Sequence, residues 1–238
     1  MALPQSSPAR HGLFAAVRAK LRLASHVFAS LRRRGPWRTI KIVLFELYYE
    51  RKFSVKTGYV IPARELGGDP DALAHSSDYF PSSYFILREV FCSGSVDYKD
   101  RVVVDYGCGL GRALMFFSTL PCKRIVGIEL SSSLAAGAVA NLTALYRRRG
   151  KTTPQWEVIT GDARRFAVPD DATVFYFFNP FDASVLRDVI GKIAESARRV
   201  PRRCTIVYAN PVHREALSRL GLRPLPSPSP DAALFALE

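Results

Sequence analysis

The residues with the clearest chemical potential lie in one stretch, Val102 to Arg112, with the sequence VVVDYGCGLGR. Glycines permit positive φ angles and let a ligand approach backbone N–H groups at the start of a helix. The dinucleotide-binding fingerprint has the spacing G-x-G-x-x-G, whereas this loop has G-x-G-x-G. The carboxylate before the loop would repel a pyrophosphate and attract an ammonium group, so the loop favours a ligand with positive charge. The residues concerned are Asp105, Gly107, Gly109 and Gly111.

Two later strand ends supply the partners that such a ligand would need. Glu129 ends an apolar run twenty residues after Gly109, a spacing at which a carboxylate can accept hydrogen bonds from both hydroxyls of a ribose. The next run is followed by Asp162 and Ala163, which offer a side-chain acceptor and a backbone N–H to an adenine edge. Ligands of such sheets bind at the carboxyl ends of the strands. An ammonium group, a ribose and an adenine together describe S-adenosylmethionine.

Strands that alternate with helices must position these residues. The apolar runs are short, β-branched or aromatic and lack alternation, which is typical of strands buried on both faces of a parallel sheet. We predict an α/β fold, doubly wound, with helices on both faces of a mostly parallel sheet. The expected strands are 101–105, 124–129, 156–160, 173–178 and 204–209, with 222–225 and 232–237 as a pair at the edge. The expected helices are 84–91, capped by Ser82 or Ser83, then 112–119, 133–148, 183–199 and 212–220.

In the order and spacing of these motifs, the chain resembles the class I S-adenosylmethionine-dependent methyltransferases over roughly residues 78–238. The resemblance implies a Rossmann-like sheet of seven strands with an antiparallel final pair, and S-adenosylmethionine as the cofactor. A Tyr-x-Pro-Ser element at Tyr79 is similar to one that helps close over the cofactor in some class I enzymes, non-SET protein lysine methyltransferases among them. The residues expected to bind the cofactor are Tyr79, Asp105, Gly107, Gly109, Gly111, Glu129, Asp162 and Ala163.

By the same resemblance, Asn179, Pro180 and Phe181 close the fourth strand beside the methyl group, and we expect Asn179 to orient the acceptor. Enzymes that methylate the amine of adenine or glutamine usually carry Asn/Asp-Pro-Pro-Tyr/Phe there. Here Phe181 replaces the second proline and Asp182 the aromatic residue, so a protein lysine or a small molecule is favoured as acceptor. His213 is a candidate general base. Simpler roles stay open, with Asn179 as a helix cap and His213 as a residue at a helix start.

The positive charge of the chain is concentrated at its N-terminus. The formal net charge is +13, and residues 1–56 contain twelve Lys or Arg against two Glu. Amphipathic helices are predicted over residues 13–31 and 37–53. We expect peripheral contact with anionic membranes through residues 10–34, although the segment also resembles an organellar transit peptide.

These patterns divide the chain into three parts. Residues 1–56 are expected to form a basic helical appendage, residues 57–95 a linker and a helix ahead of the core, and residues 96–238 the methyltransferase core. Two functions of other classes remain as alternatives. One is a nicotinamide-dependent oxidoreductase, which the loop spacing disfavours. The other is a nucleic-acid-binding module that acts through the basic arm, which rests on charge alone.

Composition narrows the class of protein further. Hydrophobic residues make up 48% of the chain, as in ordinary globular domains. No apolar run approaches the roughly 18 residues of a membrane span. The cysteines lie far apart, so we expect neither a metal site nor a disulfide framework, and we predict a cytoplasmic protein with reduced thiols. The four cysteines are Cys92, Cys108, Cys122 and Cys204.

Overall fold

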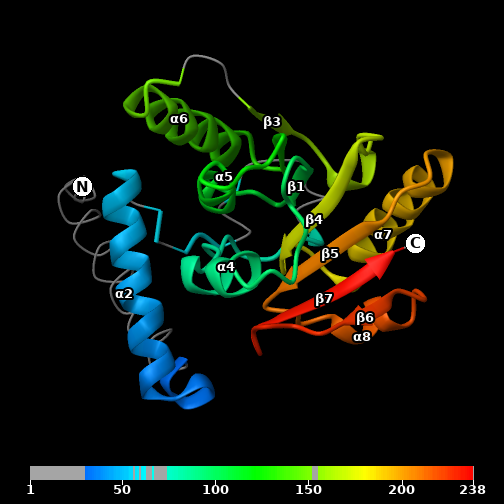
Figure 1. Ribbon diagram of the computed structural model, residues 1–238, viewed down its shortest axis with the longest axis horizontal. Helices are drawn as coiled ribbons and strands as arrows, with labels where there is room; N and C mark the ends of the chain where they lie inside the picture. The colour runs from blue at the N-terminus through cyan, green and yellow to red at the C-terminus, as the bar shows by residue number, and fades with distance from the viewer. Residues whose placement is uncertain are drawn as a thin grey trace, which may run out of the picture.

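The computed structural model contains a seven-stranded sheet with helices on both of its faces (Figure 1). The structure describes residues 30–55, 57–58, 60–62, 66, 74–151 and 155–237. The strand order is β3-β2-β1-β4-β5-β7-β6. Strands β1 to β5 run parallel, and β7 runs antiparallel to both β5 and β6. The predicted α/β fold and its antiparallel final pair are therefore confirmed.

The elements follow one another along the chain as strands separated by helices. The strands are β1 (Val102–Tyr106), β2 (Arg124–Glu129), β3 (Trp156–Thr160), β4 (Ala172–Phe178), β5 (Cys204–Ala209), β6 (Arg223–Leu225) and β7 (Ala232–Leu237). The helices are α2 (Pro36–Phe53), α4 (Tyr84–Phe91), α5 (Arg112–Phe117), α6 (Ser132–Arg148), α7 (Ala183–Arg199) and α8 (Arg214–Ser218), with a short 3-10 turn η2 (Ala163–Arg165).

The predicted boundaries agree with these elements to within a few residues. Helices α5 and α8 are shorter than expected, ending at Phe117 and Ser218. The predicted helix over residues 13–31, and with it most of the predicted membrane contact over residues 10–34, lies outside the described residues apart from their C-terminal ends. In the part of the chain that the structure describes, no helix has both the length and the apolar character of a membrane span.

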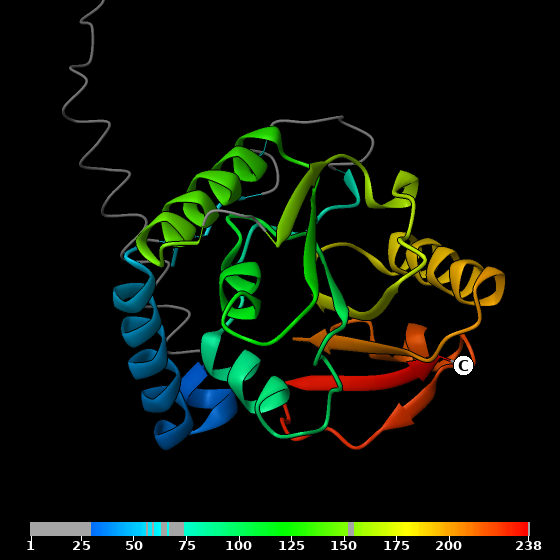
Figure 2. The same cartoon turned by 45° about the horizontal axis from the view of Figure 1, so that its top comes forward.

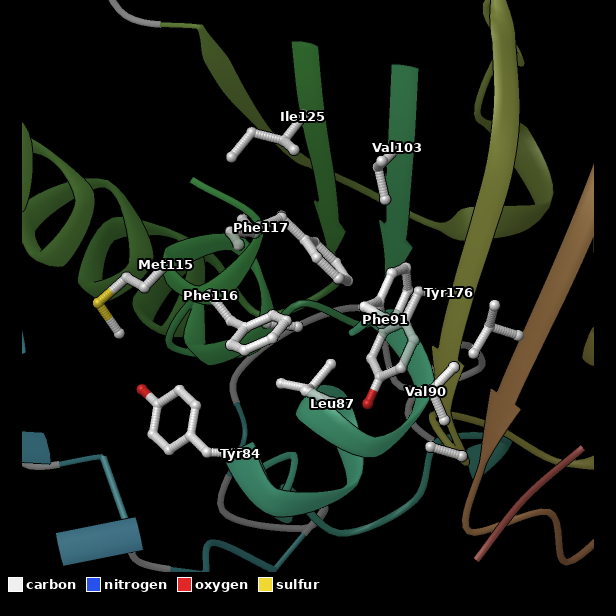
Figure 3. Packing of buried hydrophobic residues seen from close by; sticks show 14 of the residues in the cluster. Tyr84, Leu87, Val90, Phe91, Val103, Met115, Phe116, Phe117, Ile125 and Tyr176 are labelled. Atoms are coloured by element: carbon white, nitrogen blue, oxygen red, sulfur yellow. The ribbon is translucent and has the colours of Figure 1, made fainter. Parts of the chain in front are cut away.

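Strand β1 is buried on both faces and separates two apolar clusters. Val103 faces the cluster that includes side chains of α4 and α5, whereas Val102 and Val104 face the cluster that includes side chains of α7. Figure 3 shows the first cluster, in which aromatic rings from α4, α5 and β4 meet. The rings of Phe91 and Phe117 lie edge to face with centroids 4.7 Å apart. This double burial explains why the strand sequences lack polar alternation.

Helix α2 is fixed to the core by Arg112, the first residue of α5. The Arg112 side chain is 3% exposed, and it forms ion pairs with Glu46 and, at 3.2 Å, with Glu50. Its guanidinium also lies over the ring of Tyr84, 4.2 Å from the centroid. The Oε1 atom of Glu46 in turn accepts hydrogen bonds from the Ser83 hydroxyl and from the backbone N–H of Tyr84, both at 2.9 Å. Ser83 is the N-cap residue of α4, but its side chain makes no capping hydrogen bond. The carboxylate that accepts a hydrogen bond from the first backbone N–H of this helix belongs to Glu46 of α2.

We expect Arg112→Met to lower the free energy of unfolding by about 3 kcal/mol, because removing one partner of a buried ion pair leaves the other charges unpaired. Denaturation in urea, followed by circular dichroism, measures this change. The matched control is Arg199→Met, since Arg199 is 60% exposed where it pairs with Asp170, and ion pairs in solvent contribute little to stability. Equal losses in the two variants would contradict a special role for Arg112.

Candidate active site

A cleft lies at the carboxyl ends of β1 to β4, where the sheet brings several loops together. Its empty volume is about 770 Å³, with the open solvent at its mouth included. Of the twelve residues predicted for the site, eight line this cleft: Tyr79, Gly107, Glu129, Asp162, Ala163, Asn179, Pro180 and Phe181.

Glu129 ends β2 and is tied to the glycine loop. Its side chain accepts hydrogen bonds from the backbone N–H of Gly109 at 2.8 Å and from that of Ser131 at 2.9 Å. Burial raises the pKa of Glu129, although the backbone hydrogen bonds oppose this. A carboxylate oxygen has two lone pairs, so each oxygen can still accept a hydrogen bond from a ligand hydroxyl.

Asp105 lies behind the cleft and is not one of its lining residues. The residue is 3% exposed, and burial together with the negative charge of Glu129 holds the pKa of Asp105 well above its usual range. A cation in the cleft would stabilise the ionised forms of both carboxylates. Direct contact between Asp105 and a ligand stays a prediction.

The three loop glycines permit close packing around the loop. All three have positive φ angles, between 54° and 80°. A Cβ atom at Gly107 would lie 2.5 Å from Cβ of Pro180, and one at Gly109 would lie 2.3 Å from Cε2 of Tyr79. Gly111 approaches α6, and neither it nor Gly109 lines the cleft. Their contact with a cofactor stays a prediction, while the structure assigns them a packing role that the sequence pattern did not reveal.

Asp162 is held by a neighbour that the sequence analysis did not single out. Its carboxylate accepts a hydrogen bond from the backbone N–H of Arg164 at 2.8 Å and pairs with the Arg164 guanidinium at 2.8 Å. Burial acts to raise the pKa of Asp162, but the hydrogen bonds and charge of Arg164 outweigh it and lower the pKa. Asp162 is therefore an ionised hydrogen-bond acceptor on the cleft wall, beside Ala163.

Asn179 occupies a strained turn at the end of β4. Its φ angle is 45°, and its Oδ1 atom accepts a hydrogen bond from the Tyr208 hydroxyl at 2.8 Å. The N-cap residue of α7 is Asp182, so the helix-cap role left open for Asn179 is wrong. The carbonyl of Pro180 accepts a hydrogen bond from the backbone N–H of Ser77 at 3.1 Å. Both groups of the Asn-Pro pair that could hold a target amine thus already have partners.

The sequence analysis missed the pair formed by His75 and Asp182. The Nδ1 atom of His75 lies 2.7 Å from Oδ2 of Asp182, and both side chains are about two-fifths exposed (39% and 42%). His75 lines the cleft together with Asn179 and Phe181. Burial acts to raise the pKa of Asp182, but hydrogen bonds from Ser184, His75 and the α7 backbone outweigh it and hold the pKa well below its usual range. An ionised carboxylate thus orients an imidazole at the cleft.

Backbone contacts fix the two halves of this pair against each other. Ser76 and Phe181 form an isolated antiparallel bridge, and the backbone N–H of Asp182 donates to the carbonyl of His75 at 3.0 Å. The segment before the core is therefore a wall of the cleft, while closure of the Tyr79 element over a cofactor stays a prediction. His75 and Asp182 are 107 positions apart, so no local motif links them. The sequence could have revealed the pair only if each histidine had been considered as a partner for a carboxylate near the end of β4.

The structure places His213, the predicted general base, outside the lining of the cleft. His213 is the N-cap residue of α8, and its backbone N–H donates to the Tyr208 hydroxyl at 3.3 Å. Its side-chain role as a base stays a prediction. In the described residues, no group of three or more His, Cys, Asp or Glu side chains could hold a metal ion.

The residues of the cleft fit S-adenosylmethionine in charge and in position. Burial raises the pKa of both Asp105 and Glu129, so a positive charge in the cleft would stabilise their ionised forms. The ammonium and sulfonium groups of the cofactor would supply that charge. Glu129 can accept hydrogen bonds from the ribose, while Asp162 and Ala163 lie at the end of the neighbouring strand, where the adenine would be bound.

Comparison with solved structures finds distant likenesses. An RNA methyltransferase from Salinibacter ruber, in complex with S-adenosyl-L-homocysteine, is 17% identical with a TM-score of 0.47, over 66% of this chain and 91% of that one. Precorrin 8W decarboxylase from Methanobacterium thermoautotrophicum is 16% identical with a TM-score of 0.47, over 74% and 97%. Mitomycin 7-O-methyltransferase is 18% identical with a TM-score of 0.45, over 65% and 54%.

The chain spans about half the length of some solved structures that it matches, for example 53% of a further structure, from Listeria monocytogenes. The sequence matches no protein-family model and no curated protein. At these identities and TM-scores the likenesses carry no argument about function.

Proposed function

We propose that this protein is an S-adenosylmethionine-dependent methyltransferase. The observation that carries the proposal is the pair of buried carboxylates, Asp105 and Glu129, near the carboxyl ends of the adjacent strands β1 and β2, beside an open cleft. Such a pair suits a ligand with a positive charge next to a ribose. A dinucleotide would bring a negatively charged pyrophosphate to the same place, so the alternative of a nicotinamide-dependent oxidoreductase is less well supported.

The cofactor would supply an activated methyl group. The residues of this chain would bind the cofactor, orient the acceptor and exclude water. Glu129 accepts hydrogen bonds from the ribose hydroxyls, and Asp162 with Ala163 binds the adenine edge. Tyr79 lies against Gly109 and lines the cleft, where it covers the glycine loop. Asp105 acts through its charge from behind the loop.

At the other end of the cleft, His75 and Asp182 are placed to remove a proton from the acceptor. The cofactor would supply the methyl group and keep the electron pair of its carbon–sulfur bond, and the His75 imidazole would accept the proton that the acceptor loses. Asp182 orients the ring and stabilises the imidazolium that results. Asn179, whose amide is held by Tyr208, orients the acceptor beside the methyl group.

This arrangement supports an acceptor that must lose a proton, such as the amine of a protein lysine or an amine or hydroxyl of a small molecule. Nucleobase or glutamine methylation is less well supported, because Phe181 and Asp182 stand where enzymes that methylate those amines usually carry a second proline and an aromatic residue. Incubating a whole-cell extract with the enzyme and isotopically labelled cofactor, followed by mass spectrometry, identifies the molecule that gains the label.

We expect calorimetry to detect binding of S-adenosylmethionine and of its demethylated product, and Glu129→Gln to weaken both by at least about tenfold. The reason is that a hydrogen bond to a charged group contributes about 1.5–3 kcal/mol, and the amide can accept fewer of them. Binding of the demethylated product can be measured without a methyl acceptor, so the test does not depend on knowing the substrate.

The matched control is Glu157→Gln, because Glu157 lies on β3 and its side chain is 55% exposed. Its affinity for the cofactor should equal that of the wild-type protein. Tight binding of a nicotinamide dinucleotide, with none of S-adenosylmethionine, would favour the oxidoreductase and overturn the proposal. Normal cofactor binding by Glu129→Gln would show that the ribose is held elsewhere.

A further inference from the structure

Helix α2 has two apolar faces, and the larger hydrophobic side chains of one of them are exposed. The inner face packs against α4 and includes the buried residues Tyr49 and Phe53. The outer face carries side chains that globular proteins usually bury: Trp37 is 78% exposed, Ile40 48%, Val43 38%, Leu44 58%, Leu47 62% and Tyr48 56%. Figure 2 shows α2 at the periphery of the fold. Apolar side chains gathered on one exposed face mark an interaction surface.

The charges of α2 are sorted between the same two faces. Its two acids, Glu46 and Glu50, are both engaged with Arg112 on the inner side. The exposed charged residues of the helix are basic, namely Lys41, Arg51 and Lys52. The outer face, defined by Trp37, Ile40, Leu44, Leu47 and Tyr48 with these three cations, is thus apolar and positively charged, and no acid of the helix lies among its exposed residues.

We propose that this outer face of α2 binds the surface of an anionic lipid bilayer. A helix with an apolar face, flanking lysine or arginine and exposed tryptophan is the type that lies in the membrane interface, where Trp and Tyr side chains are enriched. The helix has 18 residues, a length of about 27 Å, and would lie parallel to the bilayer. Lys41, Arg51 and Lys52 would contact lipid phosphates and carboxylates.

Charge complementarity favours a lipid surface over the other occupants of such a face. In a symmetric pairing of two copies, the cations of each α2 would face those of the other with no exposed acid of the helix to neutralise them. Nucleic acid would find Ile40, Leu44 and Leu47 where phosphate contacts would be needed. An anionic bilayer offers hydrocarbon to the apolar side chains and negative charge to the cations in one surface.

The docked helix would stay connected to the cleft. The Oε1 atom of Glu50 accepts a hydrogen bond from the backbone N–H of Thr57 at 3.1 Å, and the Tyr79 hydroxyl donates to the carbonyl of Thr57 at 3.3 Å. Tyr79 in turn lies against the glycine loop. Bilayer contact through α2 would therefore hold one wall of the cleft at a fixed place relative to the membrane.

Tryptophan fluorescence of the full chain tests this surface. The protein has two tryptophans, so Trp156→Phe leaves Trp37 as the reporter. We expect its emission to shift to the blue on adding mixed phosphatidylcholine and phosphatidylserine vesicles, and to shift little with pure phosphatidylcholine. Leu44→Gln with Leu47→Gln should weaken vesicle partitioning at least about tenfold, since buried apolar area supplies the binding energy. Lys41→Gln with Arg51→Gln should weaken partitioning to the anionic vesicles by about tenfold.

The matched control is Val139→Gln with Val212→Gln, because these valines are 40% and 64% exposed on other surfaces, and partitioning should not change. Thermal unfolding checks that each variant is folded. A Trp37 emission that is already blue-shifted without lipid and stays constant with it would overturn the proposal, since another part of the chain or a second copy would then cover the face. Equal losses in the α2 variant and the valine control would overturn it as well. The test is independent of the proposed methyl transfer.

Discussion

Replacing His75 by alanine is expected to lower kcat by about 100-fold or more, since a positioned general base contributes roughly 10²–10⁴ in rate. The affinity for S-adenosylmethionine should stay within a few-fold of the wild-type value, because His75 lies at the acceptor end of the cleft. Initial rates on the acceptor found by labelling, together with calorimetry of S-adenosylmethionine binding, check both effects.

Two variants show whether the His75 effect is specific. Asp182→Asn keeps a good N-cap for α7, since Asn caps helices as well as Asp does, but it removes the charge that pairs with His75 at 2.7 Å. We expect a smaller loss of kcat than in His75→Ala and little change in stability. His213→Ala tests the rival histidine. A large loss of kcat in His213→Ala, with none in His75→Ala, would identify His213 as the general base.

Gly109→Ala is expected to weaken cofactor binding by at least about tenfold and to destabilise the fold. The left-handed backbone at Gly109, with φ 54°, costs a residue with a Cβ about 1–2 kcal/mol. In addition, the new Cβ would lie 2.3 Å from Cε2 of Tyr79, so the ring or the loop must move. Because Tyr79 lines the cleft and Gly109 donates its N–H to Glu129, either movement disturbs the site. Calorimetry and thermal unfolding measure the two consequences.

A second glycine separates the backbone cost from the clash. Gly150 also has a positive φ, 64°, but a Cβ there would meet nothing within 4 Å. Gly150→Ala should therefore show the backbone cost alone and leave cofactor affinity unchanged. Combining Gly109→Ala with Tyr79→Ala should recover part of the lost stability. If the double variant is no more stable than Gly109→Ala, contact with the Tyr79 ring is not the cause.

The sequence was sufficient to predict the strands and the residues that follow them. Strands β1 and β4 are buried on both faces, so their apolar side chains form unbroken runs that are visible without any partner. The glycine loop and Glu129 follow such runs directly, and in parallel strands the carboxyl ends meet at one edge of the sheet. The local pattern and the chain topology therefore sufficed to bring Gly107, Glu129, Asp162 and Asn179 to one cleft.

Tertiary structure decided the contacts between residues far apart in the chain. The partner of Asp182 is His75, that of Glu46 is Arg112, and the ring against Gly109 is Tyr79. Helix α2 shows the same limit, because its periodicity indicates apolar side chains around much of the helix. Packing against α4 and α5 buries Tyr49 and Phe53 while leaving Leu44 exposed. Hydrophobic periodicity records which side chains are apolar, whereas the choice of which of them to bury depends on long-range packing and on where each charge finds its partner.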